Sequence, residues 1–296
     1  MSKEDDSAVG EGWANVEFGE IELGDRIGGG GVGIIYKGYW RNEPVALKTL
    51  FDARISQELK QEYIDELLVM SKVSHSNIVK FMGACMTPPN LCFIMELCET
   101  SLFNILHVDQ LEYSLYDKVQ ALIDVGSAME YLHSLNPAII HRDLKSHNIL
   151  KSYNGVLKLC DFGLVKVKHS TAGTPAYMAP ELIENKPYNK SVDVYAFGIL
   201  IWELISQSIP SYRIDVNEIR SRTIAGVRPH VPSYGTTPRL SQLMQNCWHQ
   251  NPDARPSFAD VVDELYIIEK EVPDSKHTEN VKESVGDALD GLMTHK

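Results

Sequence analysis

The sequence predicts an α+β protein of two lobes, a small β-rich lobe with one helix followed by a larger and mainly helical lobe. In the first third of the 296 residues, short apolar runs alternate with glycine-containing turns, a pattern typical of consecutive strands. In the remainder, apolar residues recur three and four positions apart, which is typical of amphipathic helices. Clusters of polar residues lie between short apolar runs of the second lobe. We expect these clusters on loops that face the first lobe, where functional residues concentrate.

The β-rich lobe is expected over residues 13–98. Five apolar runs indicate strands, namely Ile21–Ile27, Ile34–Tyr36, Val45–Leu47, Ile78–Met82 and Leu91–Met95. One stretch between about Ser56 and Val73 carries apolar residues at helical spacing and predicts the helix of this lobe.

The helical lobe is expected over residues 99–272. Four segments have strong helical periodicity, namely Tyr116–Leu132, Val192–Ser206, Ser241–Trp248 and Phe258–Ile268. Three apolar runs are too short for helices and predict a small strand-bearing insert, namely Ile139–Ile140, Ile149–Leu150 and Leu157–Cys160. The acidic start, residues 1–12, and the polar end, residues 273–296, are expected to be tails. Apolar residues at helical spacing within 279–294 leave a docked helix open as an alternative to a frayed end.

Composition limits the kind of function. The formal net charge of −12 comes largely from the first 25 residues, whose net charge is −7, and the remainder has no clustered basic face of the kind that binds nucleic acid. The five cysteines are scattered and odd in number, which argues against a disulfide framework or a zinc site. No apolar run approaches the roughly 18 residues that span a bilayer, and the acidic start lacks the features of a secretory signal. We therefore expect a cytoplasmic protein without membrane insertion.

A glycine-rich segment lies between the first two predicted strands, with the sequence Gly28-Gly29-Gly30-Gly31-Val32-Gly33. A plain flexible hairpin is one interpretation. A dinucleotide-binding fingerprint is another, but it requires a helix afterwards, whereas β-branched Ile34 and Ile35 follow here. The strand–turn–strand context favours a flap whose backbone amides close over phosphates, where side chains would obstruct the approach.

A lysine stands on the third predicted strand, in the run Val45-Ala46-Leu47-Lys48. Its neighbours are apolar, so its ammonium group is expected near a semi-buried surface, where a charge needs a partner. Glu66 on the following helix is the preferred partner because it lies beside the apolar stripe. Glu62, one turn earlier, is the alternative.

Two polar clusters carry groups suited to phosphoryl transfer. The first, His141-Arg142-Asp143-Leu144-Lys145-Ser146-His147-Asn148, offers a carboxylate to orient a hydroxyl and accept its proton, together with a lysine and an amide that can hold phosphate and metal. The second, Asp161-Phe162-Gly163, follows a strand-like run and offers another carboxylate. Asp161 and Asn148 form a plausible magnesium pair, because Mg²⁺ prefers carboxylate and amide oxygens together with phosphate oxygens.

These segments, taken in order with Ala179-Pro180-Glu181, resemble the signature of eukaryotic protein kinases. The resemblance covers about residues 20–270 and extends through Asp193–Gly198 and Asn251–Pro256. Within that family, Phe81–Cys85 and Thr87–Leu91 are most similar to the tyrosine-kinase-like group, close to Raf and Raf-like mitogen-activated kinase kinase kinases. The resemblance implies the two-lobed kinase fold, with a small antiparallel sheet in the first lobe, and implies ATP and Mg²⁺ as cofactors.

The resemblance also assigns roles to individual residues. Lys48 would bind the α and β phosphates while paired with Glu66, Asp143 would be the catalytic base, and Asn148 and Asp161 would hold magnesium. The adenine would lie among Ile27, Ile35, Ala46 and Leu150, with Cys160 on the floor of its pocket, Met95 as gatekeeper and Glu96-Leu97-Cys98 as the hinge. Asp193 would anchor the catalytic loop, and Arg255 would pair with Glu181.

Substrate specificity can be argued from two positions. Lys145 would contact the γ-phosphate and Thr174 would tie its segment to Asp143, a pattern that resembles serine/threonine kinases. Protein substrates with serine or threonine acceptors are therefore expected, with dual or tyrosine specificity as the alternative. A pseudokinase scaffold is the rival from another class, and the Raf resemblance also implies a possible homodimer or kinase-partner contact.

The sequence departs from the family pattern at two places. Val32 occupies a position where many relatives carry an aromatic residue, and the segment from Asp161 to Glu181 is short.

Between Asp161 and Glu181, residues 166–171 are basic before modification. A phosphate on Ser170 or Thr171 could bridge Arg142 and a segment lysine, and we expect it to order the segment.

Overall fold

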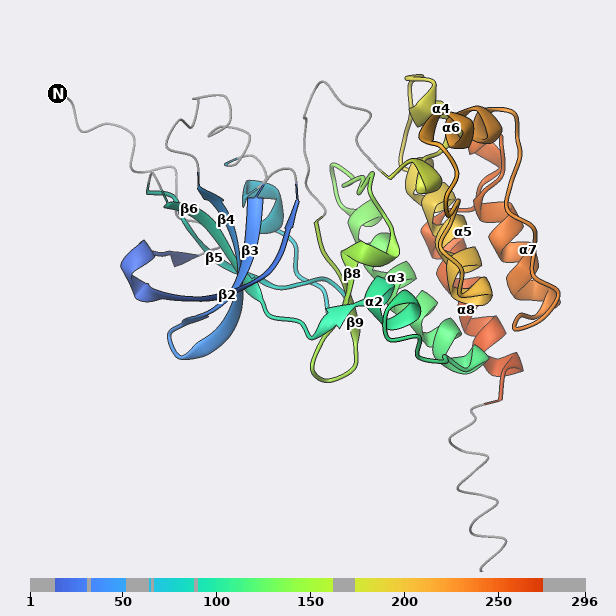
Figure 1. The fold of residues 1–296 in the computed structure, drawn as a ribbon. Helices are drawn as coiled ribbons and strands as arrows, with labels where there is room; N and C mark the ends of the chain where they lie inside the picture. The colour runs from blue at the N-terminus through green and yellow to red at the C-terminus, as the bar shows by residue number, and fades with distance from the viewer. Residues whose placement is uncertain are drawn as a thin grey trace, which may run out of the picture.

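The computed structural model describes residues 14–30, 33–51, 64, 67–87, 90–161 and 174–273. It has two lobes, a sheet at the start of the chain and a bundle of helices after it, as predicted (Figure 1). Residues 1–12 and all but the first residue of 273–296, the two expected tails, lie outside the described part. So do Glu62, Glu66, Gly31, Val32 and residues 162–173.

The described part of the first lobe contains a six-stranded sheet in the order β1-β5-β6-β4-β3-β2. Its strands are β1 (Ala14–Asn15), β2 (Ile21–Gly30), β3 (Gly33–Trp40), β4 (Glu43–Phe51), β5 (Phe81–Cys85) and β6 (Asn90–Glu96). The pairings of β2 through β6 are antiparallel, as expected, whereas the short edge strand β1 runs parallel to β5. A short 3₁₀ turn, η1 (Phe18–Glu20), joins β1 to β2.

One strand of this lobe begins later than predicted, and the predicted helix is only partly described. The strand expected from Ile78 begins at Phe81 instead, because the preceding backbone pairs elsewhere. Leu159 donates to the Asn77 carbonyl at 2.8 Å and accepts from the Val79 amide at 2.9 Å. The expected helix over about 56–73 is seen at residue 64 and over residues 67–70.

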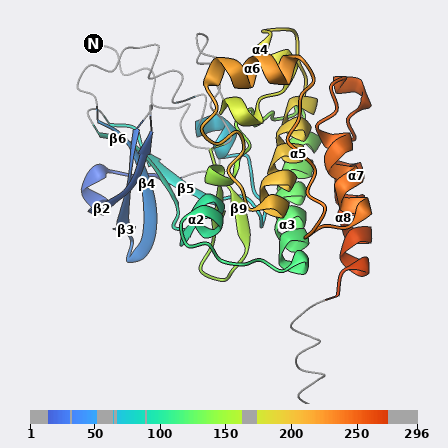
Figure 2. The same ribbon diagram turned by 45° about the vertical axis from the view of Figure 1, so that its right-hand side comes forward.

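The described part of the second lobe contains the four predicted helices and three that the sequence did not reveal. The predicted ones are α3 (Leu115–Ser134), α5 (Ser191–Ser206), α7 (Pro238–Cys247) and α8 (Phe258–Glu271), and the additional ones are α2 (Leu102–His107), α4 (Pro180–Ile183) and α6 (Val216–Ile224). α5 packs against α3 and α7, and α8 packs along α3 (Figure 2). Among the described residues, no helix is both long and apolar enough to cross a bilayer.

A second, three-stranded sheet lies beside α2 and α3, at the side of the helical lobe that faces the first sheet (Figure 1). It consists of β7 (Thr100–Ser101), β8 (Ile149–Lys151) and β9 (Leu157–Leu159). The polar cluster at 141–148 leads into β8, and Asp161 follows β9 after one residue. Two of the three predicted runs form strands, whereas Ile139 and Ile140 lie in no strand and Thr100–Ser101 supply the third one. The insert brings the 141–148 segment and Asp161 to the same edge of the helical lobe.

α5 is buried almost all round, although it contains two acids. Thirteen of its residues are buried, among them Asp193 at 1% exposure and Glu203 at 0%. A helix that is apolar on every face belongs in the interior of a lobe. A buried carboxylate needs donors, so each of these two acids marks a place where other segments must come to α5.

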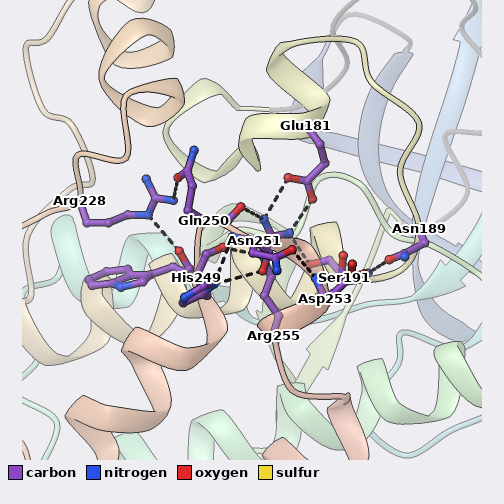
Figure 3. Close-up of polar contacts among 10 residues, drawn as sticks. Glu181, Asn189, Ser191, Arg228, His249, Gln250, Asn251, Asp253 and Arg255 are labelled. Atoms are coloured by element: carbon purple, nitrogen blue, oxygen red, sulfur yellow. Dashed lines mark hydrogen bonds and ion pairs between the residues drawn. The ribbon is translucent and has the colours of Figure 1, made fainter.

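A buried ion pair closes the helical lobe between distant segments, as expected (Figure 3). Arg255, at the end of the 3₁₀ turn η4 (Pro252–Ala254), donates to both oxygens of Glu181 at 2.6 and 2.9 Å. The Arg255 side chain is 0% exposed and that of Glu181 is 7% exposed. Arg255 also donates to the His249 and Ser191 carbonyls, so α4, α5 and the turn before α8 meet at one guanidinium group.

We expect Glu181→Gln to destabilise the protein by about 3 kcal/mol, because the substitution keeps the shape but leaves a buried guanidinium without its counter-charge. The measurement is the free energy of unfolding in urea. Glu218→Gln is the matched control, since Glu218 pairs with Arg222 on the exposed face of α6, and its cost should stay below about 0.5 kcal/mol. Equal costs for the two variants would contradict a structural role for the buried pair.

Candidate functional site

The start of the 141–148 segment is hydrogen-bonded to the buried side chain of Asp193. The two oxygens of this carboxylate accept hydrogen bonds from the backbone amides of His141, at 2.9 Å, and Arg142, at 2.8 Å. The ring of His133, near the end of α3, lies 2.8 Å from the same carboxylate through Nε2. Asp193 therefore anchors residues 141–148, called the catalytic segment below for the role that the resemblance assigns to them.

The backbone and the ring of His141 complete this support. Arg142 has φ of 68°, a left-handed conformation that is uncommon for a residue with a side chain. Two successive amides can converge on one anion when the backbone changes hand between them. The buried His141 ring accepts from the Asp143 amide through Nδ1 and lies 3.0 Å from the Cys160 carbonyl through Nε2, which connects the two polar clusters.

Asp143 lies at the centre of a compact polar group. Its Oδ2 is 2.7 Å from the Lys145 ammonium, and its Oδ1 accepts from the amide and the hydroxyl of Thr174 at 3.1 and 3.3 Å. Lys145 also donates to the Thr174 hydroxyl at 2.8 Å. Asn148 donates its side-chain amide to the Asp143 carboxylate and backbone carbonyl at 3.1 and 2.8 Å. Three of the residues named from the sequence, Lys145, Asn148 and Thr174, are thus brought together around the Asp143 carboxylate.

Lys48 reaches across from the first lobe to the second. Its ammonium group lies 3.2 Å from Oδ1 of Asp161, and the two side chains are 12% and 33% exposed. Asp161 has φ of 56°, a second left-handed residue at this edge. Glu66 and Glu62, the two partners considered for Lys48, lie outside the described residues.

The chemistry of the donors fits a magnesium ion. Asp161 supplies a carboxylate, and Asn148 turns its amide nitrogen towards Asp143, which leaves its amide oxygen for another ligand. Hard oxygen ligands of these two kinds, completed by phosphate and water, are those that Mg²⁺ prefers.

The residues predicted to hold the nucleotide lie on strands of the first sheet, in the connection after β6 and in the second sheet or next to it. Ile35 pairs with Gly28 across β2 and β3, and Ala46 pairs with the buried Met95 across β4 and β6. Ile27 is 51% exposed. Leu150 lies on β8, and Leu97 and Cys98 follow β6. The Glu96 side chain contacts Lys158 at 2.9 Å and the Lys80 amide at 3.2 Å.

The glycines of the predicted flap differ in how much space a side chain would have at each position. A Cβ at Gly33 would lie 2.6 Å from the Thr49 carbonyl oxygen, so only glycine fits there. A Cβ at Gly28 would meet only the Ile35 side chain, at 3.6 Å, and one at Gly29 would meet the flexible end of Arg26. Gly30 ends β2, while Gly31 and Val32 lie outside the described residues.

Two cysteines belong to the predicted pocket, and both are poor nucleophiles. Burial, and then the charge of Asp161, raises the pKa of Cys160 well above its ordinary value, against a smaller opposing effect of Lys48. Burial raises the pKa of Cys98 to about 11. Both thiols are therefore protonated at neutral pH, and the reactive form of each is scarce.

A second buried carboxylate, Glu203, holds the opposite end of the site and was missed in the sequence. It accepts from the Ser146 hydroxyl at 2.7 Å and the Tyr177 hydroxyl at 2.6 Å, and lies 2.8 Å from the His107 ring. Burial and the nearby Glu203 charge raise the pKa of Tyr177 well above its usual value, so its hydroxyl keeps its proton and remains a donor. The signal available in the sequence was an acid, Glu203, among the apolar residues near the end of α5.

Comparison of the sequence with known proteins identifies the family of the chain. A family model described as "Protein tyrosine and serine/threonine kinase" matches residues 21–265. Serine/threonine-protein kinase STY46 of Arabidopsis thaliana is 36% identical, covering 92% of this chain and 48% of that protein. Serine/threonine-protein kinase CTR1 of the same organism is 34% identical, covering 88% and 33%. Probable serine/threonine-protein kinase drkA of Dictyostelium discoideum is 35% identical, covering 86% and 41%.

The chain thus spans about half, or less, of the length of these relatives. The family model spans residues of both lobes, and together with the relatives it confirms the family resemblance of the sequence. The chain belongs to the protein tyrosine and serine/threonine kinase family.

Proposed function

We propose that this chain transfers the γ-phosphate of ATP to serine and threonine hydroxyls of protein substrates. The observation that carries the proposal is the group around Asp143, where a carboxylate, an ammonium group and a threonine hydroxyl lie within hydrogen-bond distance of one another. Such a group can orient an incoming hydroxyl and stabilise charge that develops on a transferred phosphate.

Each residue has a distinct part in the proposed reaction. Asp143 orients the substrate hydroxyl and takes its proton as the bond to phosphorus forms. Lys145 offsets the negative charge beside Asp143 and reaches towards the γ-phosphate. Lys48 holds the α and β phosphates. Asn148 and Asp161 would hold Mg²⁺, which neutralises charge on the phosphate oxygens when bound.

Specificity for serine and threonine rests on Thr174 and Lys145. Their hydrogen bond, 2.8 Å long, places the start of the 174–177 segment against Asp143. All three relatives described above are named as serine/threonine kinases. Dual or tyrosine specificity stays the enzyme alternative, and a scaffold without turnover is the non-enzymatic one. The cytoplasm as compartment, and contact with a second copy or a partner kinase, stay predictions from the sequence.

Control by phosphorylation is proposed for Ser170 or Thr171, which lie outside the described residues. The support lies in Arg142. Its Nε is buried and has no hydrogen-bond partner among the residues that the structure describes. Its guanidinium group lies 5.7 Å from the centre of the Tyr188 ring. A phosphate is a strong acceptor for such a donor, and Arg142 adjoins Asp143, so its position bears on the catalytic segment.

Asp143→Asn should lower kcat by at least about 100-fold, because the amide cannot accept the hydroxyl proton. The Kd for Mg-ATP should change by less than about twofold, since Asp143 is not proposed to contact the nucleotide. The measurement is phosphate transfer to a generic basic protein, with phosphoamino-acid analysis of the product. Asp109→Asn, at an exposed position after α2, is the matched control and should behave as wild type. Wild-type turnover in Asp143→Asn would contradict the mechanism, and phosphotyrosine as the main product would contradict the specificity.

Removal of phosphate from the 162–173 segment should lower activity, because the phosphate supplies the acceptor for Arg142 that orders the segment. We expect phosphatase treatment of the wild type and the Ser170→Ala/Thr171→Ala double variant to lower kcat about equally. Ser233→Ala, at an exposed position of the helical lobe, controls for loss of a surface hydroxyl. Full activity in the double variant, with no phosphate on this segment in the active wild type, would refute the proposed control.

A further inference from the structure

The sheet of the first lobe has a buried apolar cluster on each of its two faces. On β6, Phe93 and Met95 belong to the main core, which continues into the helical lobe, whereas Cys92 belongs to a second cluster. This alternation is that of a strand, whose successive side chains point to opposite faces. Cys85 on β5 belongs to the second cluster as well. Two cysteines therefore share the face of the sheet that is turned away from Met95.

Cys85 and Cys92 lie directly opposite one another in the antiparallel pairing of β5 with β6. The Cα atoms of opposite residues in such a pairing are about 4.5–5.5 Å apart, and disulfides form at Cα separations of about 4.4–6.8 Å. Both thiols are free, and the two side chains are hydrogen-bonded to each other. The two sulfur atoms can therefore be joined without a change in the register of the strands.

The other three cysteines do not have this arrangement. Cys98 follows β6, Cys160 follows β9 and Cys247 ends α7, so all three lie outside the strands. Cys85 and Cys92 are thus the two cysteines of the chain that the sheet pairing itself brings together.

The pair is poorly reactive while it is covered. Burial, with a smaller effect of the neighbouring Cys85, raises the pKa of Cys92 to about 12. The reactive thiolate is therefore scarce at neutral pH. Both residues are 0% exposed, so an oxidant dissolved in water does not reach their sulfur atoms. Oxidation of the pair depends on the opening of the contacts that cover it.

Residues 14–21 cover this face of the sheet. They supply four members of the second cluster, namely Ala14, Val16, Phe18 and Ile21. Within them, β1 is two residues long and pairs with β5 at Ala14 and Asn15, and the Val16 amide donates to the Ala84 carbonyl at 2.9 Å. An edge strand of two residues has few hydrogen bonds to break, so it opens at a lower free energy than the central strands. Opening of β1 is thus the shortest route from solvent to the two thiols.

We propose that Cys85 and Cys92 form a modification site, at which hydrogen peroxide produces a reversible disulfide between β5 and β6, and that residues 14–21 control its rate. One thiolate attacks a peroxide oxygen and becomes a sulfenic acid, and the oxygen that leaves takes up a proton as water. The second thiol attacks the sulfenic sulfur, and its proton leaves with the hydroxyl group as another water. Two thiols are oxidised to one disulfide, and one hydrogen peroxide is reduced to two waters.

The test treats the reduced full chain with hydrogen peroxide. The remaining thiols are blocked in denaturant with a light alkylating reagent, the sample is reduced, and the released thiols receive an isotopically heavy reagent. Tandem mass spectrometry then locates each label. We expect heavy label at Cys85 and Cys92 in equal amounts. Before reduction, the protein should lack the mass of two hydrogen atoms, whereas a sulfenic acid would add the mass of an oxygen. Dithiothreitol should restore both thiols.

The disulfide should also stabilise the protein, because a cross-link restricts the unfolded chain. We expect the melting temperature of the oxidised wild type to lie about 5 °C above that of the reduced protein. Reduction should reverse the shift, and Cys85→Ala should not show it.

Matched variants separate the pair from oxidation of single thiols. Cys85→Ala should leave Cys92 mainly with the light label, whereas Cys247→Ala, which removes a buried thiol of α7, should keep the heavy label at the pair. Val16→Ala should speed oxidation about tenfold, because the loss of buried methyl groups lowers the free energy of opening. Val216→Ala, at a residue of α6 that is 44% exposed, should keep the wild-type rate.

Each outcome decides a part of the proposal. Light label at Cys85 and Cys92 in both wild type and Val16→Ala, under conditions that fully oxidise glutathione in the same tube, would overturn it. So would equal heavy label at Cys92 in wild type and Cys85→Ala, a disulfide that links two chains, or an unchanged melting temperature. Equal rates in wild type and Val16→Ala would overturn the control by residues 14–21. None of these measurements depends on phosphate transfer, so the proposed function is tested separately.

Discussion

The hydrogen bonds at Asp193 are the constraint on which the site depends. The Asp193 side chain is buried, with the residue only 1% exposed. Its carboxylate accepts hydrogen bonds from the backbone amides of His141 and Arg142 and contacts the ring of His133. Burial of an unpaired carboxylate is costly, so the segment that supplies its donors is held in one position. That segment carries Asp143, and the geometry around Asp143 follows from how it is held.

Helix α5 sets the spacing of the site because it carries both buried acids. Asp193 and Glu203 are ten residues apart, which corresponds to about 15 Å along a helix. Asp193 holds the start of the catalytic segment, whereas Glu203 holds Ser146 near its end and Tyr177 beyond Thr174. Both segments that meet at Asp143 are thus hydrogen-bonded to the same buried helix, α5. Rigid supports of this kind keep catalytic groups in position before substrate arrives.

Much of this arrangement could be predicted from the sequence. Apolar periodicity identified α3, α5, α7 and α8, and motif order identified the lysine of β4 and the residues around Asp143. α2 escaped because its apolar residues are at helical spacing over only six residues, too short a window for periodicity to stand out. α6 escaped because it has few apolar residues. The start of β5 was misplaced because Val79 looks like a strand residue but bonds to Leu159, a partner 80 residues away.

The role of Glu203 could not be predicted for a related reason. Its three partners come from α2, the catalytic segment and the segment after Thr174, and no spacing within the sequence connects them. Asp193 was assigned only through family resemblance, since an acid at the start of a helix ordinarily caps it. The spacing of apolar residues predicts helices and strands, but it does not predict which distant residues will contact a single buried polar side chain.

Amide hydrogen exchange in Asp193→Asn tests the central claim most directly. An asparagine keeps the shape, but it is neutral and has only one oxygen to accept the two amides. The account predicts that exchange at His141 and Arg142 becomes at least about tenfold faster, while the interior of α5, for example Leu200, keeps its protection. Unchanged exchange at His141 and Arg142 in a folded Asp193→Asn protein would contradict the claim that this carboxylate holds the catalytic segment.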